Sequence, residues 1–298
     1  MTGRRVLITG ANSGIGKETA TALASMGASV TVTARDRAKG EAARDEIRLR
    51  SGSTDVELGS LDLASLASVR EFASWFLDSH DRLDVLINNA GVITSSRRET
   101  SDGFEEMFGV NHLGHFVLTN ELVDLLIDSA PARVVILSSV AHRFSPRGLR
   151  FDDLQTTRRF HMFTTYGRSK LANAMHALEL SRRLDGSGVT VNCLHPGTIS
   201  SRFGGDGDTR FLGGLMAGIA RPFLATPASG ARTPVLLASS TDPTVDGVTG
   251  GYFSHGRRWR PSRAARDVAA AGRLWAESER MTADASAANL GIDRDGVA

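Results

Sequence analysis

Short runs rich in β-branched residues alternate with longer amphipathic stretches along most of the chain. This alternation is typical of βαβ units, in which buried parallel strands are covered by helices. The runs predict seven strands, at 4–9, 29–34, 54–58, 83–88, 132–138, 188–194 and 249–253. Helices are predicted at 15–26, 37–50, 64–79, 102–128, 162–184, 227–239 and 262–282. We therefore expect an α/β fold, a doubly wound parallel seven-stranded sheet with helices on both faces.

A glycine-rich turn follows the first predicted strand. The sequence TGANSGIG places Gly10, Gly14 and Gly16 between that strand and the next helix. Glycines let the backbone approach a pyrophosphate closely, and a helix N-terminus offers free N–H groups and a partial positive charge. Plain turn chemistry also uses glycines at such a place, so the turn indicates nucleotide binding but leaves that alternative open.

Five short motifs occur in order along the chain: TGANSGIG (9–16), INNAG (87–91), SS (138–139), YGRSK (166–170) and HPG (195–197). Together they resemble the one-domain branch of the short-chain dehydrogenase/reductase family, over about residues 3–255. The resemblance implies a Rossmann-type sheet that binds NAD(H) or NADP(H). The stretches GVNHLGHF, SSVAH and a late GxYF are similar to the retinol dehydrogenase-like and WW-domain-oxidoreductase-like subgroup.

The resemblance assigns cofactor-binding roles to residues near several strand ends. Asp62 and Leu63 match a position that contacts adenine, and Asp62 is also interpreted as a helix N-cap. The full predicted set is Gly10, Ser13, Gly14, Ile15, Gly16, Arg35, Asp62, Leu63, Asn89, Ala90, Gly91, Tyr166, Lys170, Pro196, Gly197, Ile199 and Ser201.

The end of the second predicted strand bears on the choice of cofactor. An acidic residue there would bind the ribose 2′-hydroxyl of NAD and repel the 2′-phosphate of NADP. The matching position is Ala34, and the next residue is Arg35, whose guanidinium can bind a phosphate through two hydrogen bonds. Asp36 is interpreted as a helix cap, one position too late for the acidic slot. NADP(H) is therefore predicted as the preferred cofactor, with NAD(H) as the alternative, although Ser13 departs from relatives that carry a basic residue before Gly14.

Tyr166 and Lys170 lie four residues apart on a predicted helix, so both side chains emerge on one face. A free tyrosine has a pKa of about 10, and a nearby ammonium or an oxidised nicotinamide would lower it. The resemblance implies that Tyr166 is the general acid or base and that Lys170 binds the nicotinamide ribose and lowers the tyrosine pKa. It also implies that Ser139 hydrogen-bonds the reacting oxygen and that Asn111 holds a water in a proton relay. The alternative for Asn111 is a buried polar residue that bends its helix.

The patterns and the resemblance together predict one domain. Residues 1–255 are expected to form the NADP-binding domain, with 200–226 as a substrate lid, and 256–298 a C-terminal helical extension of the same domain. The lid segment is glycine-rich and then apolar, which favours a small hydrophobic alcohol or carbonyl substrate. A helix against another subunit or a membrane surface explains the same apolar residues. A homodimer or homotetramer is expected, with helices 102–128 and 162–184 as its interface.

Charge and composition exclude several other classes of function. The 35 basic and 33 acidic residues nearly cancel, to a net charge of +2, so nucleic acid is not an expected partner. The stretch GRRWRPSR (256–263) is interpreted as solvated loop arginines, with an anion or partner patch as the alternative. His112 and His115 lack a third ligand, so no metal site is predicted. The single cysteine, Cys193, and an N-terminus unlike a signal peptide predict a cytoplasmic location, with no membrane span and with peripheral membrane contact left open.

The leading prediction is an NADP(H)-dependent oxidoreductase that interconverts a hydrophobic alcohol and its aldehyde or ketone. One alternative is a catalytically idle NADP-sensing or scaffold protein, and another is a reductase of a conjugated pigment double bond. The complete set of Asn111, Ser139, Tyr166 and Lys170 weighs against an idle protein, because a binding protein needs no acid-base groups.

Overall fold

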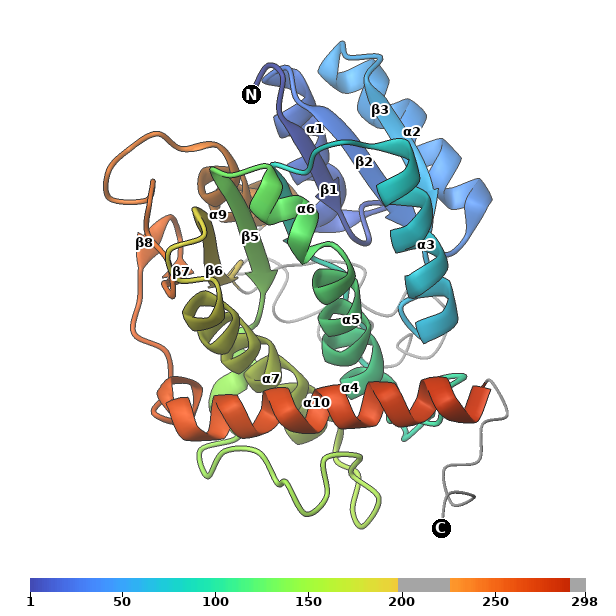
Figure 1. Ribbon diagram of the computed structural model, residues 1–298, viewed down its shortest axis with the longest axis vertical. Coiled ribbons are helices and arrows are strands. Elements are labelled where there is room, and N and C mark those ends of the chain that lie inside the picture. Colours follow the sequence, from blue (N-terminus) through green and yellow to red (C-terminus); the bar gives the residue numbers. More distant parts are fainter. Residues whose placement is uncertain (198–225, 290–298) are drawn as a thin grey trace.

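The computed structural model describes residues 1–197 and 226–289, which form one sheet covered by helices on both faces (Figure 1). The strand order is β3-β2-β1-β4-β5-β6-β7-β8, and every pair is parallel except β7 with β8. The strands are β1 (Arg5–Ile8), β2 (Ser29–Ala34), β3 (Val56–Ser60), β4 (Val85–Asn88), β5 (Ala132–Leu137), β6 (Val189–His195), β7 (Tyr252–Ser254) and β8 (Arg257–Arg258). This is the doubly wound order, so the predicted fold class is confirmed.

The seven predicted strands all occur, and the structure adds an eighth. Strand β8 is two exposed residues long and returns antiparallel to β7, where Phe253 pairs with Arg258. A pattern of buried residues cannot predict such a strand, because neither of its side chains is buried.

Helices cover the two faces of the sheet in two groups. The helices are α1 (Gly14–Ser25), α2 (Arg37–Ser51), α3 (Leu66–Ser79), α4 (Glu106–Phe108), α5 (Gly114–Glu121), α6 (Val123–Asp128), α7 (Met162–Arg183), α9 (Pro227–Ser239) and α10 (Val268–Asn289). A π-helical turn, η1 (Gly109–Leu113), and the 3₁₀ turns η2 (Val140–Phe144) and η4 (Ala264–Arg266) complete the described elements. Buried residues of α1, α2 and α9 share one core with the sheet, and those of α3, α5, α7 and α10 share the other.

The predicted continuous helix at 102–128 is wrong. The chain is extended at Glu105, where φ is −52° and ψ is 127°, and its carboxylate caps α4 by accepting from Met107 and Phe108. The π-helical turn η1 follows, and Leu122 separates α5 from α6. The spacing of apolar residues does not distinguish these short helices from one long helix. A π-helical turn changes which backbone groups are hydrogen-bonded, but it changes the pattern of buried residues little.

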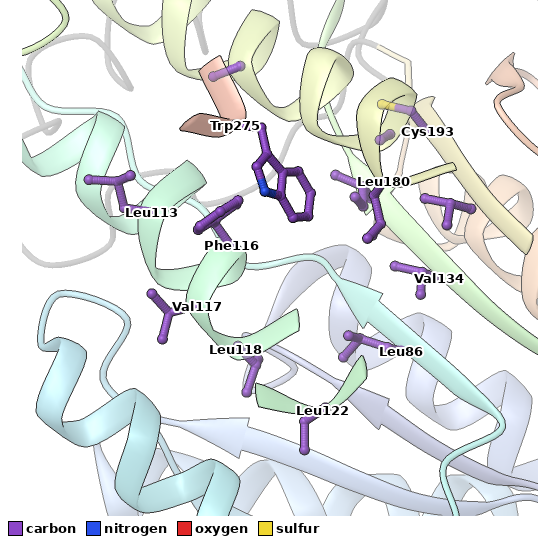
Figure 2. Close-up of a cluster of buried hydrophobic side chains, with 14 of the residues drawn as sticks. Leu86, Leu113, Phe116, Val117, Leu118, Leu122, Val134, Leu180, Cys193 and Trp275 are labelled. Atoms are coloured by element: carbon purple, nitrogen blue, oxygen red, sulfur yellow. The ribbon is translucent and has the colours of Figure 1, made fainter. Parts of the chain in front are cut away.

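The C-terminal helix α10 lies across α7 and reaches the side of the molecule that α5 occupies (Figure 1). Its Trp275 is 7% exposed and meets Phe116 of α5 edge to face, with the ring centroids 4.9 Å apart. Figure 2 shows Trp275 among apolar side chains of α5, α7 and the sheet. Helices 102–128 and 162–184 were expected to form a subunit interface; their buried residues share a core with α10 inside the chain, and the interface stays a prediction.

Two predicted absences can be compared with the described part of the chain. Within residues 1–197 and 226–289, no helix combines the length and apolarity that a bilayer span requires. The same residues hold no cluster of three side chains able to ligate a metal. His112 instead lies 2.9 Å from the Ser278 hydroxyl, and His115 lies 2.8 Å from the Thr9 hydroxyl, so the two rings serve different parts of the fold.

Candidate active site

Four of the five motifs lie at the carboxyl ends of β1, β4, β5 and β6, which are consecutive in the sheet, and the fifth, YGRSK, lies on α7. Parallel strands place these ends at one edge, so loops distant in sequence meet there. The strand order reverses between β1 and β4, and doubly wound folds bind ligands outside the sheet at such a reversal. Residues of TGANSGIG and INNAG lie directly at this point.

The turn after β1 is closely packed against the turn after β4. Gly10 has φ of +65°, and an added Cβ there would lie 2.8 Å from the Ala90 Cβ. At Gly16 an added Cβ would lie 2.5 Å from the Asn89 Nδ2 and 2.7 Å from the Gly10 carbonyl oxygen. The Asn89 amide in turn donates to the Thr9 carbonyl at 2.7 Å and to the Gly10 carbonyl at 3.2 Å. The glycines therefore permit an approach of two backbones that any side chain would block.

The N-terminus of α1 opens at this turn. Gly14 has φ of +59°, a conformation that glycine adopts without steric cost. Ser13 precedes it in extended conformation, and its side chain makes no capping hydrogen bond to the helix. Ile15 is buried in the core beneath. The first turn of α1 thus keeps the features of an anion site, with a positive dipole end and backbone N–H groups that no cap side chain takes up.

Thr9 and His115 hold this region together, and sequence patterns missed both roles. The Thr9 hydroxyl accepts from the backbone N–H groups of Asn89 at 2.9 Å and Ala90 at 3.0 Å. The Asn111 carbonyl can only accept, so the His115 Nδ1 donates to it at 3.1 Å and the His115 Nε2 accepts from the Thr9 hydroxyl at 2.8 Å. Burial lowers the pKa of His115 to about 3, which keeps the ring neutral. These contacts span up to 106 residues of sequence, and no local pattern indicates them.

Asn111 lies in the π-helical turn and is fully buried. Its amide accepts from the Val92 N–H at 2.7 Å, and it donates to the Val92 carbonyl at 3.0 Å and the Ser169 hydroxyl at 2.9 Å. Ser169 donates onward to the Tyr166 carbonyl at 2.8 Å. The side chain thus joins the loop after β4 to α7, and the predicted water relay at Asn111 stays a prediction.

The structure brings Ser139, Tyr166 and Lys170 together. The Ser139 and Tyr166 side chains share a hydrogen bond. The Lys170 ammonium is buried, donates to the Leu137 carbonyl at 3.3 Å and lies 5.8 Å from the centre of the Tyr166 ring. An added Cβ at Gly91 would lie 3.1 Å from the Lys170 Nζ, so INNAG borders the same space.

The pKa of Tyr166 differs from the sequence-based expectation. Burial raises it to about 12, because desolvation outweighs the opposing hydrogen bond from Ser139. Burial lowers the pKa of Lys170 to about 8. The protein alone therefore makes Tyr166 a weaker acid, and the expected depression of its pKa by Lys170 is wrong for these residues by themselves.

The residues after β2 and β3 lie farther along the same edge of the sheet. β2 ends at Ala34, and Arg35 follows as an exposed residue. Asp36 caps α2 by accepting from the Lys39 N–H at 3.0 Å, which confirms its interpretation as a cap. Asp62 accepts from the Ala64 N–H at 2.9 Å, but the cap of α3 is Ser65, so the interpretation of Asp62 as the N-cap is wrong.

Adjacent to Asp62, Leu63 is buried against α5, where an added Cβ at Gly114 would lie 2.6 Å from the Leu63 carbonyl oxygen.

The motif HPG follows β6, which ends at His195. Gly197 has φ of +91° and donates its N–H to the His195 Nδ1 at 3.1 Å. The His195 Nε2 lies 2.8 Å from the Ser254 hydroxyl, and burial lowers the pKa of His195 to about 4. His195 therefore shapes the Pro196–Gly197 turn, a role that sequence patterns missed. The predicted residues Ile199 and Ser201 lie outside the described residues, as does the predicted lid except for Thr226, which caps α9.

The chain is similar in sequence and in fold to several known proteins. A family model described as short chain dehydrogenase matches residues 4–150. Human retinol dehydrogenase 14 is 44% identical over 295 residues, which cover 94% of this chain and 87% of that protein. An uncharacterised Mycobacterium paratuberculosis protein of known structure is 37% identical over 94% of both chains, with a TM-score of 0.73. Pseudomonas aeruginosa RhlG, solved in complex with NADP, is 29% identical over 85% of this chain and 95% of that one, with a TM-score of 0.66.

Proposed function

The chain belongs to the short-chain dehydrogenase/reductase family and is similar to its retinol dehydrogenases; we propose that, within this class of NAD(P)-dependent oxidoreductases acting on CH–OH groups, it uses NADP(H) and interconverts a hydrophobic alcohol with its aldehyde or ketone. The observation that carries the proposal is the convergence of Ser139, Tyr166 and Lys170 beside the glycine turn after β1.

The residues at the carboxyl edge fit a dinucleotide. Gly10 and Gly16 leave the backbone bare where side chains would collide, and the N-terminus of α1 suits a pyrophosphate. Ser13, Gly14 and Ile15 begin that helix, while Asn89, Ala90 and Gly91 border the turn. Pro196 and Gly197 follow β6 at the same edge of the sheet, and under this proposal they would border the nicotinamide. When bound, the nicotinamide supplies the hydride for reduction or accepts it in oxidation.

Replacement of Gly16 by alanine should weaken NADP(H) binding by at least about tenfold, because the added methyl forces Asn89 or the Gly10 backbone away. The unfolding free energy should fall by about 1–3 kcal/mol, as in other overpacked sites. Calorimetric titration and urea unfolding measure both. Gly272→Ala is the matched control, since it is also helical and its nearest neighbour would be the Glu179 Oε2 at 4.0 Å. Equal cofactor affinity in the two variants would contradict this account of the turn.

Tyr166 acts as the proton donor in the reductive direction under this proposal. Its phenol gives a proton to the carbonyl oxygen of the substrate, which Ser139 holds by a second hydrogen bond. A raised pKa suits a donor that must stay protonated until the oxygen becomes basic. In the oxidative direction Tyr166 must accept the proton, and the Lys170 ammonium and the charge of an oxidised nicotinamide would then favour the phenolate.

Arg35 supports the preference for NADP(H), because it is exposed directly after β2, where the adenosine ribose of a dinucleotide would lie. Arg35→Ala should raise the Kd for NADPH by about 10- to 100-fold and leave the Kd for NADH within about twofold, since only NADPH carries the 2′-phosphate. Calorimetry with both cofactors measures the difference. Arg37→Ala serves as control, because it removes the same charge from the first turn of α2, two residues beyond Arg35. A wild-type protein that prefers NADH would overturn the assignment.

A hydrophobic substrate is supported by the surroundings of the catalytic residues. Val140 and Phe144 on η2 and Phe163 on the first turn of α7 are 38%, 56% and 43% exposed, and they neighbour Ser139 and Tyr166 in sequence. The similar curated proteins are named retinol dehydrogenases. With aldehydes of graded chain length, kcat/KM for NADPH oxidation should therefore rise with length. Binding of NADPH without turnover of any aldehyde or alcohol would favour the idle NADP-sensing protein instead.

Assembly and location belong to the same proposal. A homodimer or homotetramer is expected, and the part of α7 that α10 contacts is not available to its interface. Light scattering gives the mass in solution, and fractionation of cells distinguishes a cytoplasmic location from peripheral contact with a membrane. Cys193, the single cysteine, is buried and unpaired, which agrees with a reducing compartment.

A further inference from the structure

A buried histidine, His142, contacts the backbone of Ser139, the serine of the proposed reaction. His142, on η2, has no exposed surface, although three residues away Ser139 borders the site. The His142 Nδ1 lies 2.6 Å from the Ser139 carbonyl oxygen. Its Nε2 lies 3.1 Å from the backbone nitrogen of Ser262. One imidazole thus spans the catalytic loop and the segment 256–263, the arginine-rich stretch that the proposed function leaves without a role.

The chemistry of these partners determines the tautomer of His142. A backbone N–H can only donate, so the Nε2 must accept from Ser262 and carry no proton. The proton therefore lies on the Nδ1 and is donated to the Ser139 carbonyl. Burial lowers the pKa of the ring, so it stays neutral in this arrangement. Both ring nitrogens of His142 therefore form hydrogen bonds: the Nδ1 donates and the Nε2 accepts.

A second donor meets the same carbonyl. The Tyr252 hydroxyl donates to the Ser139 carbonyl at 3.4 Å, and its ring packs against the imidazole with centroids 5.2 Å apart. Tyr252 lies on β7, so the sheet supports the contact. His142 and Tyr252 thus both donate to the backbone carbonyl of Ser139, and both lie outside the motifs SS and YGRSK.

From these contacts we propose that His142 is a positioning residue for the reaction, which orients the Ser139 hydroxyl by holding its backbone against Ser262. The proposal rests on the proposed function of Ser139. The hydroxyl of Ser139 accepts from the Ala141 N–H at 3.2 Å and shares a hydrogen bond with Tyr166. Any rotation of the Ser139 peptide therefore moves the group that must hold the substrate oxygen. Misplacement by about 1 Å is enough to cost about 100-fold in rate.

The test compares two replacements that differ in one hydrogen bond. In His142→Asn the amide nitrogen can lie near the former Nδ1 and still donate to the Ser139 carbonyl, whereas His142→Leu removes that donor. We expect His142→Leu to lower kcat by about 10- to 100-fold while the Kd for NADPH and KM stay within about threefold. His142→Asn should recover most of kcat. His176→Leu is the control for loss of a buried imidazole, since neither His176 nitrogen has a hydrogen-bond partner among the described residues.

Equal kcat in the wild type and His142→Leu would overturn the proposal, as would equal losses in the leucine and asparagine variants. A second measurement needs no turnover and no leucine variant. In ¹⁵N-histidine spectra of the wild type, the signals absent from His142→Asn should report a neutral ring protonated on Nδ1, and protonation on Nε2 would also overturn it. If the wild type turns over no substrate, the proposed function fails, while this spectrum still decides whether His142 holds Ser139.

Discussion

Tyr166→Phe is expected to lower kcat by about 10²- to 10⁴-fold, because the substrate oxygen loses its proton donor. The Kd for NADPH should stay within about twofold, since the phenyl ring keeps the packing and only the hydroxyl is lost. Stopped-flow measurement of NADPH oxidation and calorimetric binding give the two quantities on the same preparation. The side chain of Tyr166 shares a hydrogen bond with Ser139, so its hydroxyl lies next to the group proposed to hold the substrate oxygen.

The other tyrosine of the chain is the matched comparison. The Tyr252 hydroxyl lies 3.4 Å from the backbone carbonyl oxygen of Ser139 and 3.3 Å from the His142 Nδ1. Tyr252→Phe should therefore lower kcat by less than about tenfold. Turnover by Tyr166→Phe equal to that of the wild type would remove the assigned acid-base role.

Replacement of Lys170 should lower kcat whether it removes the positive charge or only changes the shape of the cation. The Lys170 side chain is 3% exposed, and Gly91 borders its Nζ closely, so the broad planar guanidinium of Lys170→Arg has no room. Lys170→Met removes the charge altogether. Both replacements should lower kcat by about 10²- to 10³-fold, the usual cost of a lost preorganised donor. Lys39→Met, on the exposed side of α2, should leave kcat unchanged.

The lowered pKa of Lys170 predicts a dependence on pH that separates its roles. The ammonium is charged below a pKa of about 8 and becomes neutral as the pH rises through it. A cofactor that binds the charged form should therefore bind more weakly above about pH 8, by up to tenfold per pH unit. In Lys170→Met that decline should be absent. A wild-type affinity that is flat up to pH 10 would show that Lys170 does not bind the cofactor through its charge.

The alternating sheet pattern could be predicted because each central strand is buried on both faces. Leu86 and Ile87 of β4, and Val134 and Val135 of β5, point to opposite faces in each strand and are at most 1% exposed, so both faces select apolar residues there. Short glycine motifs at the strand ends were equally informative. The contacts at Gly16 leave no space for a side chain, so a glycine at this position in the sequence indicates a close approach of two backbones.

What could not be predicted depends on contacts between distant segments. The hydrogen bond between Thr9 and His115 and the ring contact between Phe116 and Trp275 both join residues separated by many elements. His112 and His115 were excluded as a metal site, but their hydroxyl partners could not be predicted, because a histidine looks the same in sequence whatever its ring nitrogens contact. Without cofactor the pKa of Tyr166 is raised rather than lowered, since its burial cannot be judged from the spacing of Tyr166 and Lys170.

Transfer of deuterium from labelled cofactor distinguishes an oxidoreductase of alcohols and carbonyl compounds from a protein that only binds NADP(H). NADPH deuterated on both faces of nicotinamide C4 is incubated with the wild-type protein and a long-chain aldehyde, and the alcohol product is analysed by mass spectrometry. The account predicts one deuterium on the former carbonyl carbon, formed by the wild type and, at a rate lower by about 10²- to 10⁴-fold, by Tyr166→Phe. Tight binding of NADPH with no deuterium in any product, across the series of aldehydes and ketones, would contradict it.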